Sequence, residues 1–250
     1  FDGYQFVVYR EDARNPRSFF GSYIYSLYAA PAGNLWIGTE KGLNRYDPAT
    51  NSFTRYLHGD NLSNKIFSIC EDRAGQLWVG TDTGVSRFDP ATGRFTRYRH
   101  DPARPESLSH DFIYSTYCDR AGVLWICTGG GLDRYDSDTG HFAHYRHDPA
   151  DPSSLSSNLT SAICEDRAGF LWVATRGGGL NRLNRATGHF TRYEHDPANP
   201  FSLGSNDVVA VFEDTQARLW VGTVGDGLNL FDRTTGRFAH YLPNPFDPQS

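Results

Sequence analysis

The sequence contains no methionine, only 4 cysteines in 250 residues, and no excess of positive charge. The formal net charge is −5, which argues against nucleic acid as a partner because phosphate backbones attract basic surfaces. No run of about 18 apolar residues occurs, so no direct membrane insertion is expected in this segment. No secretory signal pattern is found, and the missing methionine suggests a chain trimmed from a longer one.

One motif is repeated five times along the chain. Its marker is a tryptophan, and the successive spacings are 42, 47, 47 and 48 residues. An alternating stretch rich in Ile, Val, Tyr and Phe precedes each tryptophan, and period-2 alternation is typical of a β-strand. The tryptophans are Trp36, Trp78, Trp125, Trp172 and Trp220.

Each repeat predicts four short antiparallel strands. A polar turn such as EDRAG follows the first strand, and LWVGT forms the second. A glycine-containing loop leads to a third strand such as GLNRYD, and FTRY forms the fourth. Four strands every 42 to 48 residues are typical of β-propeller blades, so an all-β propeller is predicted. The expected blades cover about 22–58, 64–100, 111–147, 158–195 and 206–242.

A small residue stands two positions after every tryptophan. Alternation along a strand places both on one face of the sheet. We therefore expect each tryptophan to be buried against the neighbouring blade, with the small residue making room. The small residues are Gly38, Gly80, Cys127, Ala174 and Gly222.

An additional copy of the outer strand is predicted at residues 4–10. The stretch FDGYQFVVYR aligns with the end of a third strand and a whole fourth strand. The chain therefore has five complete blades plus one extra outer strand. Either the five blades close alone, or they are part of a larger ring.

The repeat resembles a known family. The string EDRAGQLWVGTDTGVSRFDPATGRFTRY at 71–98 is similar to the two-component regulator propeller repeat, and all five units share the pattern. That resemblance implies a sensor domain of a bacterial signalling receptor, such as a hybrid two-component system, a sensor kinase or a diguanylate cyclase. It also implies a periplasmic location and other domains of a parent receptor as partners.

The four cysteines and the repeated histidines are expected to be structural. Cys70 and Cys164 hold the same position two blades apart, so we expect four buried thiols rather than disulfides. The histidines of the HDP stretches follow outer strands of separate blades and point away from one another. No metal or cofactor is therefore expected, and no nucleophile or metal motif of an enzyme is found. These histidines are His100, His147 and His195.

Residues that differ between blades remain as candidates for a binding site. The loops between strands two and three, and those between blades, share one side and vary in sequence, whereas the DRAG turns on the other side are uniform. Charges of both signs on the variable side, at the mouth of a central channel, suit a polar small molecule such as an oligosaccharide. The candidates are Tyr23, Glu40, Lys41, Lys65, Asp82, His110, Arg176 and Asp226.

Three classes of function remain open at this point. The first is a non-catalytic ligand-sensing domain, which the family resemblance favours, and the second is a protein-interaction platform, with a homodimer as one form. The third is a lyase of the streptogramin lyase type, because those enzymes are propellers with similar repeats. A lyase needs a convergent acid, base and metal, and only His110 lies near the predicted channel mouth.

Overall fold

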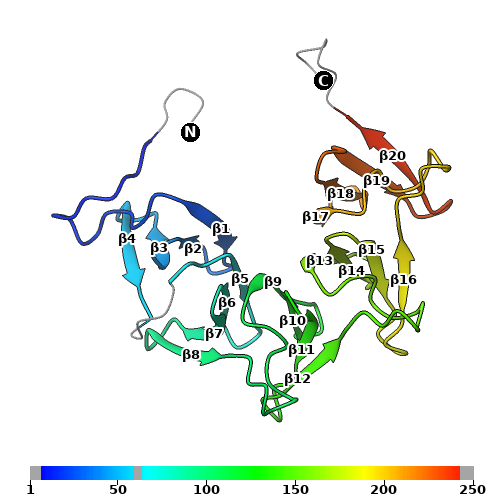
Figure 1. Cartoon of the computed structure of the whole chain (residues 1–250). Coiled ribbons are helices and arrows are strands. Elements are labelled where there is room, and N and C mark those ends of the chain that lie inside the picture. The colour runs from blue at the N-terminus through cyan, green and yellow to red at the C-terminus, as the bar shows by residue number, and fades with distance from the viewer. Residues whose placement is uncertain (1–6, 59–63, 243–250) are drawn as a thin grey trace. The chain divides into compact units, whose positions relative to one another are not determined.

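All regular structure in the described part of the chain is β-strand. The computed structural model describes residues 7–58 and 64–242. Within them, twenty strands form five antiparallel sheets, each made of four successive strands (Figure 1). The predicted all-β propeller fold with four-stranded blades is confirmed. None of the described residues belongs to a helix that could cross a membrane.

The strands fall within the ranges expected for the five blades. Blade 1 has β1 (Ile24–Ala29), β2 (Leu35–Thr39), β3 (Leu43–Asp47) and β4 (Ser52–Tyr56). Blade 2 has β5 (Ser68–Glu71), β6 (Leu77–Thr81), β7 (Gly84–Asp89) and β8 (Arg94–Tyr98). Blade 3 has β9 (Ile113–Cys118), β10 (Leu124–Thr128), β11 (Gly131–Tyr135) and β12 (Phe142–Tyr145). Blade 4 has β13 (Thr160–Glu165), β14 (Leu171–Thr175), β15 (Gly179–Leu183) and β16 (Phe190–Tyr193). Blade 5 has β17 (Val208–Glu213), β18 (Leu219–Thr223), β19 (Leu228–Asp232) and β20 (Arg237–Tyr241).

The chain divides into two compact units. Unit 1 contains Phe1–Arg99 and Asp111–Thr116, and unit 2 contains His100–His110 and Tyr117–Ser250. Unit 1 therefore holds blades 1 and 2 with the start of β9. Unit 2 holds the rest of blade 3 together with blades 4 and 5.

The extra strand expected at 4–10 begins in residues outside the described ranges. Residues 7–10 are described and belong to no strand. Tyr9 nevertheless packs on blade 1, where its ring centroid lies 5.2 Å from that of Phe53. Its hydroxyl donates a hydrogen bond of 2.6 Å to Asn51. This segment therefore lies against the outer strand of blade 1 without strand pairing among its described residues.

Each blade packs its tryptophan face on the next blade within a unit. In unit 1, Trp36 and Leu43 of blade 1 form one buried cluster with Ile66 and Ile69, which lead into and form β5 of blade 2. In unit 2, Trp172 packs in the same way against blade 5. The predicted burial of tryptophan between blades is confirmed at these joints.

Trp220 departs from that prediction. The first four tryptophans are at most 3% exposed, whereas the side chain of Trp220 in blade 5 is half-buried. The described residues contain no sixth blade that could cover it. The repeat alone could not predict this difference, because the sequence of blade 5 follows the same pattern as that of blade 4.

The turn before the second strand is fixed by its aspartate. Oδ1 of Asp72 accepts hydrogen bonds from the backbone N–H groups of Ala74 and Gln76. Its Oδ2 accepts one of 2.9 Å from Nε1 of Trp78. The same aspartate–indole bond recurs in blades 3, 4 and 5, so this turn also orients the core tryptophan. The turn was predicted from the sequence but this bond was not, although in blades 2 to 5 an aspartate stands six residues before the tryptophan; blade 1 has Ala30 there.

The small residue after each tryptophan makes room for the next blade, as expected. A Cβ placed on Gly80 would lie only 2.6 Å from Cγ2 of Ile113. A Cβ on Gly222 in blade 5 would meet only the Cβ of Ala210, at 3.3 Å. Gly80 therefore leaves the space that Ile113 of the next blade occupies.

We expect Gly80→Ala to destabilise the protein by about 1–3 kcal/mol, the usual cost of overpacking a core. The matched variant Gly222→Ala should stay within about 0.5 kcal/mol of the wild type, because its methyl group would meet only the Cβ of Ala210, at 3.3 Å. Urea denaturation followed by circular dichroism measures both changes. Equal losses in the two variants would contradict this account of the joint.

The cysteines agree only in part with the prediction. All four are thiols rather than disulfides, as expected. Cys70 and Cys127 are buried, but Cys118 and Cys164 are half-buried, so the expectation of four buried thiols is wrong. Burial raises the pKa of Cys127 and of Cys164 to about 12, which keeps both protonated and unreactive at neutral pH.

Candidate ligand-binding site on the loop side

Threonine at the end of the second strand holds the loop between strands two and three. In blade 1, Oγ1 of Thr39 donates a hydrogen bond of 3.0 Å to the carbonyl oxygen of Gly42. The same bond closes the loop in every other blade, at 2.7 to 3.1 Å. We call the side of each blade that carries these loops the loop side. The backbone of these loops is therefore held in the same way in every blade, and only their side chains vary.

A buried amide or carboxylate on the third strand holds the segment that leads into the blade. Oδ1 of Asn44 accepts a hydrogen bond of 3.0 Å from the backbone N–H of Phe20. Asn181 and Asn229 make the equivalent bonds in blades 4 and 5. Both kinds of loop on this side are thus attached to the sheet beneath them.

Glu40 and Tyr23 lie together on the loop side of blade 1. The carboxylate of Glu40 accepts hydrogen bonds of 2.7 and 2.9 Å from the backbone N–H groups of Ser22 and Tyr23. Burial raises the pKa of Glu40, but these donors outweigh that effect and the pKa lies below its ordinary value. Glu40 therefore caps the start of β1, while the ring of Tyr23 is exposed.

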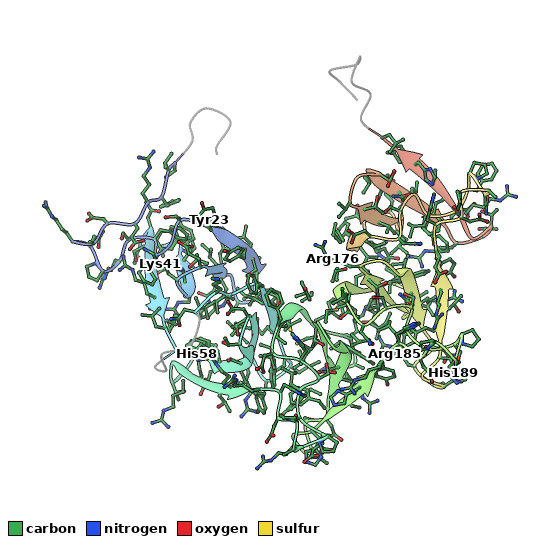
Figure 2. The ribbon with its side chains drawn as sticks, viewed as in Figure 1. Tyr23, Lys41, His58, Arg176, Arg185 and His189 are labelled. Atoms are coloured by element: carbon green, nitrogen blue, oxygen red, sulfur yellow. The ribbon has the colours of Figure 1, made fainter. Side chains whose placement is uncertain are left out.

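Lys41 is occupied by an ion pair that sequence analysis missed. Its Nζ lies 2.6 Å from Oε2 of Glu11 and sits over the ring of Phe20. Figure 2 shows Lys41 beside the N-terminal segment of unit 1. This hydrogen bond from Lys41 lowers the pKa of Glu11. The pair reduces the net charge that this loop offers to a ligand.

Lys65 and Asp82 meet on the loop side of blade 2. Nζ of Lys65 lies 3.5 Å from Oδ2 of Asp82. The other carboxylate oxygen, Oδ1, is buried and has no hydrogen-bond partner among the described residues. An acceptor of this kind costs free energy unless a donor reaches it. Asp82 therefore has one buried, unsatisfied oxygen and one oxygen that faces Lys65.

The three candidates of unit 2 have separate surroundings. Nη1 of Arg176 lies 3.7 Å from Oδ1 of Asp207, the residue directly before β17. The ring of His110 lies over Gly129, where an added Cβ would come within 3.0 Å of Nδ1. Asp226 is exposed and lines a cavity of about 260 Å³ together with His195 and His240.

The structure places five candidates in unit 1 and three in unit 2. It joins Tyr23 to Glu40 and Lys65 to Asp82. It places Lys41 beside Glu11 and Arg176 beside Asp207. The candidate charges are thus largely compensated by local partners, which sequence analysis did not foresee.

Blade 3 contains a buried ion pair that sequence analysis also missed. Asp133, on β11, is fully buried, and its Oδ1 lies 2.6 Å from Nδ1 of His144 on β12. Oδ2 of Asp133 accepts a hydrogen bond from the N–H of Ser109, and Nε2 of His144 bonds to the carbonyl oxygen of Pro105. The hydrogen bond to Asp133 raises the pKa of His144, which favours the doubly protonated ring. Blade 3 is the one repeat with a carboxylate at this position of the third strand, where blades 1, 4 and 5 have Asn and blade 2 has Ser.

The repeated histidines have structural partners rather than one another. Nδ1 of His100, His147 and His195 lies 2.7 to 2.8 Å from a leucine carbonyl oxygen eight residues further along the chain. These bonds brace the segments that join successive blades. Across residues 7–58 and 64–242, no group of three or more His, Cys, Asp or Glu side chains could hold a metal ion.

The turn side is less uniform than predicted. In unit 2, Arg185 bridges Asp119 of blade 3 and Glu165 of blade 4, at 3.2 and 2.8 Å. Arg233 bridges Asp166 and Glu213 in the same way in the next joint. In blade 2 a proline occupies the position of Arg185. These bridges fix two joints of unit 2, so the turn side has its own charge pattern.

A family model described as two component regulator propeller matches four stretches of the chain. They are residues 18–41, 62–83, 107–130 and 154–177. Each stretch runs from the segment before a blade through the loop after its second strand. The model thus covers the loop-side residues of blades 1 to 4. No curated protein matches the chain.

Two similar solved structures are extracellular domains from B. thetaiotaomicron. One belongs to a hybrid two-component system, with 27% identity and a TM-score of 0.74, over 88% of this chain and 30% of that chain. The other belongs to a one-component system, with 26% identity and a TM-score of 0.62, over 96% of this chain and 33% of that chain. The chain thus spans about a third of each of these domains.

A virginiamycin B lyase from Staphylococcus aureus has a similar fold. Its identity is 18% and its TM-score 0.66, over 89% of this chain and 71% of that chain. At this identity the likeness concerns the fold alone. The repeated strands, the aspartate–tryptophan turns and the matched repeats lead to one assignment: the chain is a β-propeller that carries two-component regulator propeller repeats.

Proposed function

We propose that this chain is a non-catalytic, ligand-sensing propeller segment of a bacterial signal-transduction receptor. The observation that carries the proposal is its likeness, in both sequence and fold, to extracellular domains of two-component and one-component systems. Because the chain spans about a third of those domains, other domains of a parent receptor are its natural partners. An extracytoplasmic, periplasmic location follows from the same likeness.

The ligand in this proposal is a polar small molecule such as an oligosaccharide. It would bind on the loop side, where side chains vary between blades while the backbone frame is constant. In unit 1 the carboxylate of Asp82 supplies an acceptor, and in unit 2 the guanidinium of Arg176, at 3.7 Å from its carboxylate partner, retains donors for a ligand. The exposed ring of Tyr23 offers an apolar surface on which a sugar can stack. Small-molecule sites typically combine an apolar surface with a few polar groups.

A panel of oligosaccharides tested by thermal shift and calorimetry examines this proposal. For a sugar that binds, we expect Asp82→Ala in unit 1 or Arg176→Ala in unit 2 to weaken binding by about tenfold, or about 1.4 kcal/mol, according to which unit holds the site. Arg73→Ala on the turn side is the matched control and should leave affinity unchanged. Full binding by both loop-side variants, together with loss of binding in the control, would show that the site lies on the turn side.

The absence of catalysis in this proposal is tested separately. The likeness to lyases is below the level at which activity can be transferred, so we expect no cleavage of a streptogramin B antibiotic by the purified chain. His110→Ala serves as the reference variant, since His110 is the one histidine among the candidate residues of the loop side. Turnover by the wild type that His110→Ala abolishes would overturn the non-catalytic assignment.

A further inference from the structure

A pocket on the turn side of blade 4 is lined by an arginine and an exposed aromatic ring. It has a volume of about 300 Å³, and all of its lining residues belong to unit 2. Its rim is formed by two turns, the one between β13 and β14 and the one between β15 and β16. The lining includes Phe170, Arg182, Asn184, Arg185 and Thr191. We call it the Phe170 pocket.

Arg182 is the cation of this pocket that a ligand can engage. Its guanidinium carbon lies 4.8 Å from the centroid of the Phe170 ring, so the cation is stacked on the ring. Within the described part of the chain, no atom makes an ion pair or a hydrogen bond with that guanidinium. Arg185, in contrast, is already held by Asp119 and Glu165. The N–H groups of Arg182 can therefore donate to an anion.

Blade 4 lacks the carboxylate that accompanies this arginine in other blades. Two residues after Arg182 stands Asn184, where the other four blades have aspartate. In blade 3, the hydrogen bond from the backbone N–H of Asp138 does most to lower the pKa of Asp136, and the charge of Arg134 lowers it further. An aspartate at this position therefore lies near enough to offset the charge of the arginine, whereas the neutral Asn184 does not offset it. The aspartates are Asp47, Asp89, Asp136 and Asp232, and the arginines of blades 1 to 3 are Arg45, Arg87 and Arg134.

The aromatic ring at the rim is also particular to blade 4. Phe170 is 42% exposed, although a ring of this size stabilises a fold mainly when it is buried. It stands two residues before the tryptophan, where no other blade has an aromatic residue. Blade 4 thus combines an apolar surface with an available cation, as small-molecule sites do. The counterparts of Phe170 are Asn34, Gln76, Val123 and Arg218.

We propose that the Phe170 pocket binds a small aromatic carboxylate. The carboxylate accepts hydrogen bonds from the guanidinium of Arg182, in the paired arrangement that these two groups favour. The ring of the ligand packs against the exposed part of Phe170. A single available guanidinium matches a single negative charge, whereas a phosphate monoester carries nearly two at neutral pH. The pocket lies on the turn side, so this inference does not rest on the loop-side site for a saccharide.

Titration of the whole chain with benzoate, followed by saturation-transfer difference NMR, is the first measurement. We expect a dissociation constant on the order of 1 mM, because so small a ligand makes one charged contact and one ring contact. Acetate keeps the charge without the ring, and benzyl alcohol keeps the ring without the charge. Each should bind at least about tenfold more weakly than benzoate. Phenyl phosphate should bind no more tightly than benzoate.

Substitutions that copy another blade into blade 4 provide the decisive test. Arg182→Leu copies blade 5, and Asn184→Asp copies the other four blades, so the fold should persist in both variants. Asn184→Asp also keeps the turn, because Asp136 accepts from Asp138 the backbone hydrogen bond that Asn184 accepts from Ala186. We expect each variant to bind benzoate about tenfold more weakly than the wild type. Arg134→Leu makes the same change at the equivalent arginine of blade 3 and should leave the affinity unchanged.

Three outcomes would overturn the proposal. A wild type that binds no benzoate at about 20 mM would show that the pocket does not take this class of ligand. Wild-type affinity in a folded Arg182→Leu or Asn184→Asp variant, as judged by circular dichroism, would place the carboxylate elsewhere. Equal weakening in Arg134→Leu would mean that benzoate does not distinguish blade 4 from blade 3. Loop-side variants do not alter this pocket, so a failure of the saccharide proposal leaves these results unchanged.

Discussion

Replacing Trp172 by alanine is expected to destabilise the protein by about 3–5 kcal/mol, the usual cost of removing a large core side chain. Trp172 is 1% exposed and packs at the joint of blades 4 and 5, with its ring centroid 5.1 Å from that of Phe231. Its indole N–H donates a hydrogen bond of 2.7 Å to Asp166. The substitution therefore leaves a cavity and removes a donor from a buried carboxylate.

Trp220→Ala is the matched control for this change. Its indole makes the same hydrogen bond, to Asp214, but the side chain is half-buried and no described blade covers it. We expect its replacement to lower the free energy of unfolding by less than half as much as Trp172→Ala does. The midpoint of urea denaturation, followed by circular dichroism, measures the loss of stability in both variants. Equal losses would mean that packing between blades contributes little to the role of the tryptophan.

Asp166 adds a pH-dependent part to the Trp172 prediction. Burial raises the pKa of Asp166, but the hydrogen bonds from Trp172 and Arg233 outweigh burial, and the pKa lies below its ordinary value. A carboxylate with a lowered pKa in the folded state stabilises the protein above its unfolded pKa and loses this contribution as the pH falls. Removing Trp172 weakens that contribution, so the deficit of Trp172→Ala should be larger at neutral pH than in acid.

The fold could be predicted from the sequence because the blades repeat the same pattern of turn and packing residues. Asp72, six residues before Trp78, fixes the turn and the ring together, and Gly80 then admits the next blade. These contacts join residues a few positions apart, or they recur between the same two positions of neighbouring blades. Periodic spacing therefore reveals them. The exposure of Trp220 was not predictable, because it depends on what lies beyond blade 5.

The candidate site was less predictable because its contacts follow no period. Variation between blades identified Lys41 and Arg176, but not their partners. Glu11 reaches Lys41 from the segment before blade 1, and Asp207 reaches Arg176 from the segment between blades 4 and 5. Only the three-dimensional structure shows that these charges are paired. A charged residue that appears in one repeat alone, as Asp133 does, is the signal that a repeat offers for such pairs.

Replacing His144 by alanine is expected to cost about 3 kcal/mol below the pKa of the histidine, since it leaves the fully buried Asp133 without its cation. The hydrogen bond to Asp133 raises the folded pKa of His144 above the ordinary value of 6.5. A raised histidine pKa stabilises the folded state fully below the unfolded pKa, and this contribution is lost as the pH rises through the folded pKa. The wild type should therefore lose stability from weakly acidic to alkaline pH.

His144→Arg is the variant that separates charge from packing in this pair. Blades 1, 2 and 4 have arginine at this position, and Arg192 of blade 4 donates to the carbonyl oxygen of Ser154 in the preceding segment. Arginine keeps the positive charge beside Asp133 at every pH that the fold survives. We expect urea denaturation midpoints of His144→Arg to vary less with pH than those of the wild type. A wild type and a variant with parallel pH profiles would show that His144 is not the group that titrates, and would assign the pH dependence to another residue.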